Sequence, residues 1–192
     1  AGTKRIIVEY PVGSSIFDTL EFVINQPDAI QNNTVPTNVS CNGGNDGSIS
    51  FTTFLGTAGY FYSLNGGANQ YNANGSYSFN NLSPGSYTVD VEDINGCTYI
   101  GNPILITITQ PAVLTASIQQ TATSCFGGND GSATVLPSGG TSPYSYSWSN
   151  GSVNQSATGL TTGLYTCTIT DANGCIVTQS ITVTQPPSAL SI

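Results

Sequence analysis

The feature that most constrains this chain is an octet that occurs twice, 84 residues apart. The first copy, Cys-Asn-Gly-Gly-Asn-Asp-Gly-Ser, begins at Cys41, and the second, Cys-Phe-Gly-Gly-Asn-Asp-Gly-Ser, begins at Cys125. Each octet is followed by a Tyr-x-Tyr pair, a Leu-x-x-Gly-x-Tyr-Thr segment, an Asp-x-Asn-Gly-Cys segment and a run that ends in Thr-Gln-Pro. A period of about 80 residues suits an independently folded domain rather than a solenoid unit. The sequence therefore predicts a tandem array of small domains.

The matching segments also predict the domain boundaries. Residues 28–111 form the first predicted repeat and residues 112–186 the second. Residues 1–27 resemble the end of such a repeat, because they close on the same alternating run and Gln-Pro pair, and we expect them to be the closing β-hairpin of a preceding unit. Residues 187–192 resemble the start of a following repeat or a linker. We therefore expect the chain to be a segment of a longer array.

Alternation of apolar and polar residues dominates both repeats and indicates β-strands with one buried face. In the first repeat the alternating segments are Ile49-x-Phe51, Tyr60-x-Tyr62-x-Leu64, Tyr87-x-Val89-x-Val91 and Ile104-x-Ile106-x-Ile108. Clusters of Gly, Asn and Pro separate these segments, and no helical periodicity is found. Short strands with such spacing are typical of antiparallel sandwiches. We predict an all-β fold of tandem immunoglobulin-like antiparallel β-sandwiches.

Two further patterns support the immunoglobulin-like arrangement. The segments that lead to Tyr87 and Tyr165 have the form of a tyrosine corner, in which the phenol bonds back to upstream backbone. The Asn95-Gly96 and Asn173-Gly174 pairs that follow are typical of a tight hairpin with positive φ angles.

The large aromatic side chain of the core is expected at Trp148. This residue lies on the third predicted strand of the second repeat, where immunoglobulin-like cores commonly place a large aromatic. The first repeat has Leu64 at the matching position. We therefore expect a neighbour such as Phe51 or Phe61 to fill the core of the first repeat.

Charge excludes several classes of partner. Lys4 and Arg5 are the only basic residues, against ten acidic ones, and the formal net charge is −8. Repeats without a positive side chain gain no affinity by neutralising phosphates, so we expect neither nucleic acid nor an anionic membrane as a partner. No apolar run approaches the length of a membrane span, so we expect no membrane insertion. The apolar fraction of 38% nevertheless suffices for a folded core.

Residues for common catalytic mechanisms are missing. The chain has no histidine, and it has no lysine or arginine after residue 5, which excludes the usual general bases and oxyanion clamps. Asp90, Glu92 and Asp93 form an acidic cluster, but Thr168 and Thr170 replace the first two in the second repeat. We interpret the cluster as a solvated strand face, and we predict no enzymatic activity, no catalytic residue and no cofactor.

Four aspartates shared by the repeats are weak candidates for calcium ligands. They are Asp46 and Asp130 in the octets, and Asp93 and Asp171 in the Asp-x-Asn-Gly-Cys segments. Calcium favours oxygen-rich loops and stiffens extracellular arrays. Each loop offers a single carboxylate, however, and Asn-Asp-Gly is also what a turn requires. We expect turn geometry, with calcium binding as the alternative.

The motifs resemble a known family. The series Cys-x-Gly-Gly-x-Asp-Gly-Ser, Pro-Tyr-x-Tyr-x-Trp-Ser-Asn-Gly, Leu-x-x-Gly-x-Tyr-Thr, Asp-Ala-Asn-Gly-Cys and Thr-Gln-Pro is similar to the SprB-type repeat of surface adhesins from Flavobacterium-like Bacteroidetes. The resemblance covers nearly all of residues 112–186. Residues 28–111 depart from it, because they lack the Trp and carry an insertion at residues 101–103.

This resemblance implies a large adhesin that is exported by type IX secretion, displayed on the cell surface and active in attachment and gliding motility. The implied partners are neighbouring repeats of the same long chain, the secretion and gliding machinery, and a surface polysaccharide or solid surface. The resemblance identifies no ligand, and the repeats could serve as a stalk or as an adhesive array.

The cysteines are expected to form disulfides outside the cell. The simplest scheme pairs Cys41 with Cys97 and Cys125 with Cys175 within each repeat. These positions lie at opposite ends of an immunoglobulin-like sandwich, roughly 17–20 Å apart, whereas a disulfide bridges Cα atoms no further apart than about 7 Å. The alternative joins Cys41 to Cys175 of the next repeat, and both schemes stay open, with a slight preference for the first. Cys167 alternates inward and is expected to be a buried free thiol.

Two other functional hypotheses remain. A carbohydrate-binding module would use exposed aromatics of the first repeat, at Gln70-Tyr71-Asn72 and Ser76-Tyr77. An accessory module of a secreted hydrolase would have its catalytic domain outside this chain.

Thr19, in Asp-Thr-Leu, resembles an O-glycan acceptor.

Overall fold

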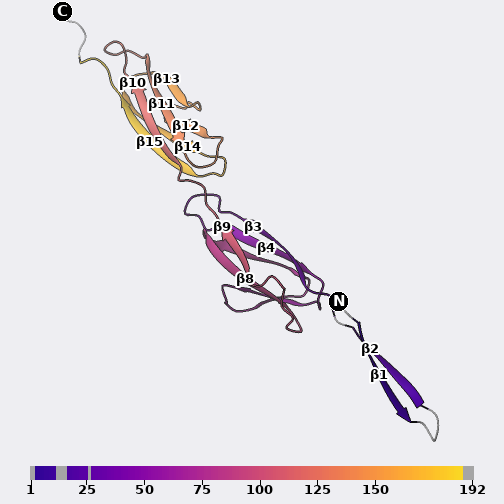
Figure 1. Ribbon diagram of the computed structural model, residues 1–192. Coiled ribbons are helices and arrows are strands. Elements are labelled where there is room, and N and C mark those ends of the chain that lie inside the picture. Colours follow the sequence, from indigo (N-terminus) through magenta and orange to yellow (C-terminus); the bar gives the residue numbers. More distant parts are fainter. Residues whose placement is uncertain (1–2, 12–16, 26, 188–192) are drawn as a thin grey trace, which may run out of the picture. The chain divides into compact units, whose positions relative to one another are not determined.

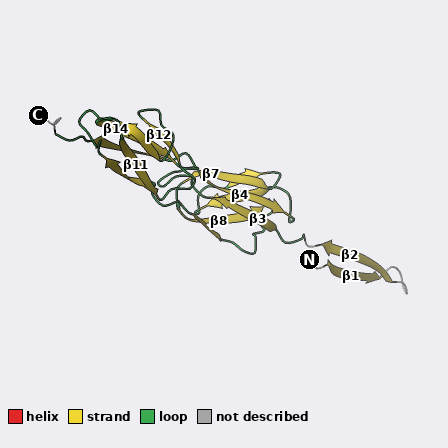
Figure 2. Ribbon diagram, turned by 90° about the horizontal axis from the view of Figure 1, so that it is seen from above, coloured by secondary structure: helices red, strands yellow, loops and turns green. Residues whose placement is uncertain are grey.

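The computed structural model describes residues 3–11, 17–25 and 27–187. These residues form strands, turns and loops, with no helix in the ranges described (Figure 2). The chain divides into two compact units. The first comprises residues 1–37, 48–80 and 85–107, and the second comprises residues 38–47, 81–84 and 108–192. Two loops of the first predicted repeat, 38–47 and 81–84, are therefore grouped with the second unit.

The N-terminal segment is a β-hairpin. Strand β1 (Thr3–Pro11) pairs antiparallel with β2 (Phe17–Asn25), so that Thr3 lies opposite Asn25. Thr19, the candidate O-glycan acceptor, lies in β2 opposite Glu9. The predicted C-terminal segment lies outside the described residues, apart from residue 187.

The strands of the first repeat form two antiparallel sheets. One sheet has the order β3 (Gln31–Thr37), β4 (Gly47–Phe54), β7 (Ser76–Leu82). The other has the order β6 (Gln70–Asn72), β5 (Tyr60–Leu64), β8 (Gly85–Asp93), β9 (Ile104–Ile108). All four alternating segments identified in the sequence lie in these strands.

The second repeat has the same strand order without the edge strand β6. All of its strands are labelled in Figure 1. One sheet contains β10 (Thr115–Thr121), β11 (Gly131–Ser138) and β13 (Ser156–Leu160), and the other contains β12 (Ser145–Trp148), β14 (Gly163–Thr170) and β15 (Ile176–Val183). The first, second and fourth strands thus share one sheet, and the third, fifth and sixth share the other. This is the strand distribution of immunoglobulin-like sandwiches, and it confirms the predicted fold class.

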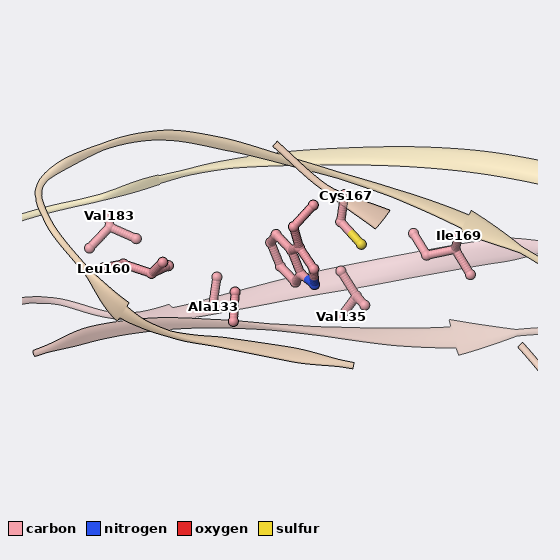
Figure 3. Packing of buried hydrophobic residues seen from close by; sticks show 8 residues of the cluster. Ala133, Val135, Leu160, Cys167, Ile169 and Val183 are labelled. Atoms are coloured by element: carbon pink, nitrogen blue, oxygen red, sulfur yellow. The ribbon is translucent and has the colours of Figure 1, made fainter. Parts of the chain in front are cut away.

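The core of the second repeat lies between its two sheets. Side chains of β11 and β13 meet those of β12, β14 and β15 in one buried cluster. Figure 3 shows Cys167 and Ile169 above Val135, with Leu160 and Val183 further along the same layer. Trp148 is 3% exposed, and its indole N–H donates to the carbonyl of Asn154 at 2.9 Å. The third strand therefore carries the large aromatic of the core, as its position predicts.

The first repeat fills its core with Tyr62 instead of a tryptophan. Tyr62 is fully buried, and its ring centroid lies 5.5 Å from that of Phe51. Its hydroxyl donates to the Gly75 carbonyl at 2.9 Å, so the buried phenol is satisfied. Phe51 is buried as expected. Phe61 is only half-buried, so the prediction that it could fill the core is wrong. Because side chains alternate along a strand, Phe61 faces away from Tyr62 and contacts Tyr71 on the edge strand.

The tyrosine corner lies where the chain passes from one sheet to the other, and the Asn-Gly turns join neighbouring strands of one sheet. The Tyr165 hydroxyl donates back to the Thr161 carbonyl at 3.2 Å, between β13 and β14. In the Asn-Gly pairs only the glycines have positive φ, 76° at Gly96 and 85° at Gly174. Each pair thus supplies its positive φ angle at the glycine.

Candidate functional site

The first recurring element carries the octet cysteine, and we call it the cysteine loop (residues 39–46 and 123–130). In the first copy the Asp46 carboxylate accepts the Ser40 N–H at 3.0 Å, and the Gly44 N–H donates to the Cys41 carbonyl at 3.0 Å. The second copy repeats both bonds, with Asp130 and Ser124 at 3.0 Å and Gly128 and Cys125 at 3.0 Å. The octet is therefore a turn with a defined hydrogen-bond pattern.

The glutamine of Thr-Gln-Pro closes each cysteine loop from the end of the repeat. Gln110 accepts the Gly43 N–H through Oε1 at 2.7 Å, and Gln185 accepts the Gly127 N–H at 3.0 Å. Sequence reasoning treated this glutamine only as part of a motif. Its recurrence at the same place in each repeat is the signal that could have identified it as a loop clamp.

The second recurring element lies at the end of β8 in the first repeat and of β14 in the second, and we call it the aspartate turn (residues 93–97 and 171–175). The carboxylate of Asp171 accepts backbone N–H groups from Thr141 at 2.8 Å, Asn173 at 2.9 Å and Cys175 at 2.9 Å. Asp93 accepts the matching bonds from Thr57 at 3.0 Å, Asn95 at 3.0 Å and Cys97 at 2.9 Å. Each turn thus holds its cysteine by the main-chain N–H.

All four aspartates have a pKa below the ordinary value. For Asp46, hydrogen bonds from the side chain and backbone of Ser40 lower the pKa, and for Asp130 those from Ser124 do the same. For Asp93 and Asp171, burial raises the pKa, but the backbone N–H groups that donate to the carboxylate outweigh it and lower the pKa overall. Hydrogen bonds to the charged form account for this direction.

A disulfide joins one element of each kind. Cys41 of the first cysteine loop is bonded to Cys175 of the second aspartate turn, at a sequence separation of 134 and with 5.8 Å between the Cα atoms. Beside the bond, the Asn173 side chain donates to the Ser40 carbonyl at 2.9 Å. Both ends of this disulfide belong to the second compact unit, which includes residues 38–47.

This bond corrects the preferred pairing of Cys41 with Cys97 and of Cys125 with Cys175. Cys97 and Cys125 are exposed free thiols. In the second repeat, Cys125 lies before the start of β11. The turn that carries Cys175 is hydrogen-bonded to Thr141, which lies beyond the other end of that strand. An eight-residue strand spans roughly 23 Å, which no disulfide can bridge.

Cys167 is the third free cysteine, and it is fully buried in the core of the second repeat. Burial raises the pKa of its thiol. A protonated, enclosed thiol is a small apolar side chain rather than a nucleophile.

The carboxylates of the four calcium candidates hold turns. Each carboxylate already accepts backbone N–H groups, and among the described residues no three His, Cys, Asp or Glu side chains form a group that could hold a metal ion. We expect the melting temperature of the chain to be the same in EDTA as in millimolar calcium chloride. A melting temperature that falls on chelation and recovers with calcium would contradict this expectation.

The lowered pKa values predict acid sensitivity. A carboxyl group with a folded-state pKa below its unfolded value of about 3.9 stabilises the fold above that value, and the stability is lost as pH falls through the folded-state pKa. We expect the melting temperature to be level from neutral pH to about pH 5 and to decrease below about pH 4. Asp171→Asn should melt lower at neutral pH and show a weaker decrease in acid.

The matched control is Asp90→Asn, because the Asp90 side chain has no hydrogen bond within the described ranges and lies on a strand. Its melting curve should follow that of the unmodified chain at every pH. Equal behaviour of the Asp171 and Asp90 variants would refute the assigned role of the aspartate turn.

Together, the sandwiches, cysteine loops and aspartate turns define a tandem of immunoglobulin-like β-sandwich repeats. The family model of the SprB repeat matches this chain twice, over residues 33–69 and 117–153. Each match runs from the first strand of a repeat to just beyond its third strand, and includes the cysteine loop. The resemblance to SprB-type repeats is thereby confirmed.

Two solved structures are similar to this chain at low sequence identity. The chain is 14% identical to a C-terminal fragment of intimin in complex with the translocated intimin receptor, with a TM-score of 0.39, covering 84% of this chain and 64% of that one. It is 16% identical to the amphioxus IgVJ-C2 molecule, with a TM-score of 0.32, covering 84% of this chain and 99% of that one. The comparison with curated proteins gives no match. Among the described residues, no helix has the length and apolarity to cross a membrane.

Proposed function

We propose that this chain is a non-enzymatic segment of a large extracellular adhesin, exported by type IX secretion and acting in attachment and gliding motility. The proposal assigns it the role of a structural array, whose partners are neighbouring repeats of the same chain and the gliding machinery. The observation that carries the proposal is the double match to the SprB repeat. The disulfide adds support, because such bonds persist in oxidising, extracellular surroundings.

The composition of the surface also supports a structural role. The repeats lack histidine, lysine and arginine, and the shared aspartates are used to hold turns. A recurring side chain that stabilises its own loop is not available as a general acid or base. What recurs between the repeats is therefore the geometry of a scaffold.

The proposal is tested on the source cells. An antibody raised against this chain should label intact, non-permeabilised cells, and the label should disappear when type IX secretion is disabled. Deletion of the coding segment should reduce attachment or gliding. Labelling that requires permeabilised cells would overturn the extracellular assignment, and unchanged attachment and gliding would overturn the adhesin role.

A carbohydrate-binding role is the second candidate, because one aromatic side chain of the first repeat is suitably exposed. Tyr71 is 54% exposed on the edge strand β6, and its ring lies 5.2 Å from that of Phe61. Tyr77 does not belong to such a platform, since it is half-buried and stacks on Tyr62 with the ring planes 12° apart. The candidate surface is thus smaller than the sequence suggested.

A glycan array separates the two roles. A structural array binds no glycan, whereas a carbohydrate-binding module binds and loses binding in Tyr71→Ala. Phe126→Ala is the matched control, because Phe126 is an aromatic of similar exposure, 53%, in the other repeat. An accessory module of a hydrolase would instead raise the activity of a catalytic domain joined to it.

A further inference from the structure

The two repeats contain two cysteine loops and two aspartate turns, of which only one pair is bonded. The disulfide uses the loop of the first repeat and the turn of the second. The remaining turn carries Cys97 and the remaining loop carries Cys125, and both thiols are exposed. The chain therefore presents one unbonded element of each kind.

The unbonded turn has the geometry of the bonded one. Asp93 holds Cys97 by its N–H at 2.9 Å, the distance found between Asp171 and Cys175. Asn95 donates to Thr57 Oγ1 at 3.0 Å, as Asn173 donates to Thr141 Oγ1 at 3.1 Å. Asn173 also donates to the Ser40 carbonyl of the bonded loop, whereas the Asn95 amide has no second partner among the described residues.

The unbonded loop likewise has the geometry of its bonded counterpart. Ser124 donates its N–H to Asp130 at 3.0 Å, and the Gly127 N–H is held by Gln185 at 3.0 Å. The Ser124 carbonyl, which corresponds to the acceptor of the Asn173 side chain, has no partner within the part of the chain that the structure describes. The unbonded loop and the unbonded turn thus already have the conformation of their disulfide-bonded counterparts.

An exposed apolar side chain lies near each free thiol in sequence. Cys97 lines a hollow of about 250 Å³ together with Pro27, Ile30, Asp93 and Ile100. Ile100 is 83% exposed. Phe126, next to Cys125, is 53% exposed, whereas the bonded loop has Asn42 at this position. Covering such side chains is favourable, so both thiols lie on surfaces that a second repeat can bury.

We propose that Cys97 and Cys125 are the two halves of a repeat-to-repeat disulfide, equivalent to the bond between Cys41 and Cys175. Cys97 accepts the cysteine loop of another SprB-type repeat, and Cys125 accepts the aspartate turn of another. In a preparation of this chain the other repeat is a second copy, so that Cys97 of one molecule bonds to Cys125 of the next. This inference rests on the matched geometry and holds whether or not the chain adheres to anything.

The bond forms by thiol–disulfide exchange with a small disulfide oxidant such as oxidised glutathione. One cysteine loses its proton to water and attacks the oxidant, which breaks the S–S bond of the oxidant and releases one glutathione thiolate. The second cysteine, also deprotonated, attacks the protein sulfur of the mixed disulfide and releases the second glutathione thiolate. Two protein thiols are oxidised, and one oxidant disulfide is reduced to two thiols.

The test oxidises the full chain with glutathione over a range of protein concentrations and separates the products on non-reducing gels. The unmodified chain should form dimers and longer oligomers. C97S and C125S should each stay monomeric, because each has only one half of the joint. Their mixture should form dimers that extend no further. Because trypsin has no site after Arg5, pepsin digestion and mass spectrometry should identify a peptide pair containing Cys97 and Cys125.

Several outcomes would overturn the proposal. Symmetric dimers in C97S or C125S alone, as abundant as the oligomers of the unmodified chain, would show unselective pairing of exposed thiols. A bond between Cys97 and Cys125 within a monomer would contradict the joint. An unmodified chain that stays monomeric, with both thiols open to alkylation after oxidation, would also contradict it. Neither variant should change the melting temperature, because both side chains are exposed.

Discussion

Replacing Trp148 by alanine should lower the free energy of unfolding of the second repeat by about 3–5 kcal/mol, the cost of removing a buried aromatic from a close-packed core. Trp148 is 3% exposed, and it belongs to a buried cluster that includes several smaller side chains, among them Ala133, Ala157 and Cys167. Such neighbours have little freedom to move into the vacated space. The variant also leaves the Asn154 carbonyl without the indole N–H that it accepts.

The measurement is urea unfolding followed by circular dichroism. Trp148 is the only tryptophan, so its fluorescence reports the unfolding of the second repeat in the unmodified chain but is lost in the variant. Leu64→Ala is the matched control, because Leu64 occupies the aligned position of the first repeat and is half-buried. Its effect should be clearly smaller. A loss of less than about 1 kcal/mol in Trp148→Ala, a value typical of ordinary substitutions, would contradict the assigned core.

Replacing both Cys41 and Cys175 by serine should destabilise the chain by about 2–5 kcal/mol, the range measured for disulfides. The bond closes a sequence separation of 134 residues, and the chain-entropy model predicts about 5 kcal/mol for a loop of that length. The expected result is a lower melting temperature under non-reducing conditions. Reduction of the unmodified chain should reproduce it.

C97S is the matched control for this experiment, because Cys97 is the residue of the first repeat that corresponds to Cys175 of the second, and it is unbonded. An exposed substitution of this kind usually changes stability by no more than about 0.5 kcal/mol. If the double serine variant and C97S melt at the same temperature, the disulfide does not contribute to stability in the manner described.

The strands and most core positions could be predicted because alternation is a local property of the sequence. Tyr60, Tyr62, Val89 and Val91 have the inward positions that a period of two assigns to them, and they are buried. The tyrosine corner at Tyr165 was predictable for a similar reason, since its donor and acceptor lie four residues apart.

The failures involve contacts between distant segments. The positions of five cysteines in the sequence do not indicate which loops lie close together. The bond between Cys41 and Cys175 could therefore be predicted only as one of two pairing schemes. The role of Gln110 was missed because its partner, Gly43, is 67 residues away. Tyr77 was assigned to an exposed platform because a Ser-Tyr-Ser segment does not indicate which face stacks on Tyr62.

The disulfide also determines how the chain carries tension. A force applied to the two ends of the polypeptide passes through the backbone as far as Cys41, crosses the S–S bond and continues from Cys175. The residues between the cysteines, which are 134 positions apart in sequence, lie outside this covalent path. Fully extended, they would add about 450 Å to the length of the chain, at 3.3–3.6 Å per residue. The chain cannot extend by this length until the bond is reduced. The redox state of one disulfide therefore determines the maximum length of this segment under tension.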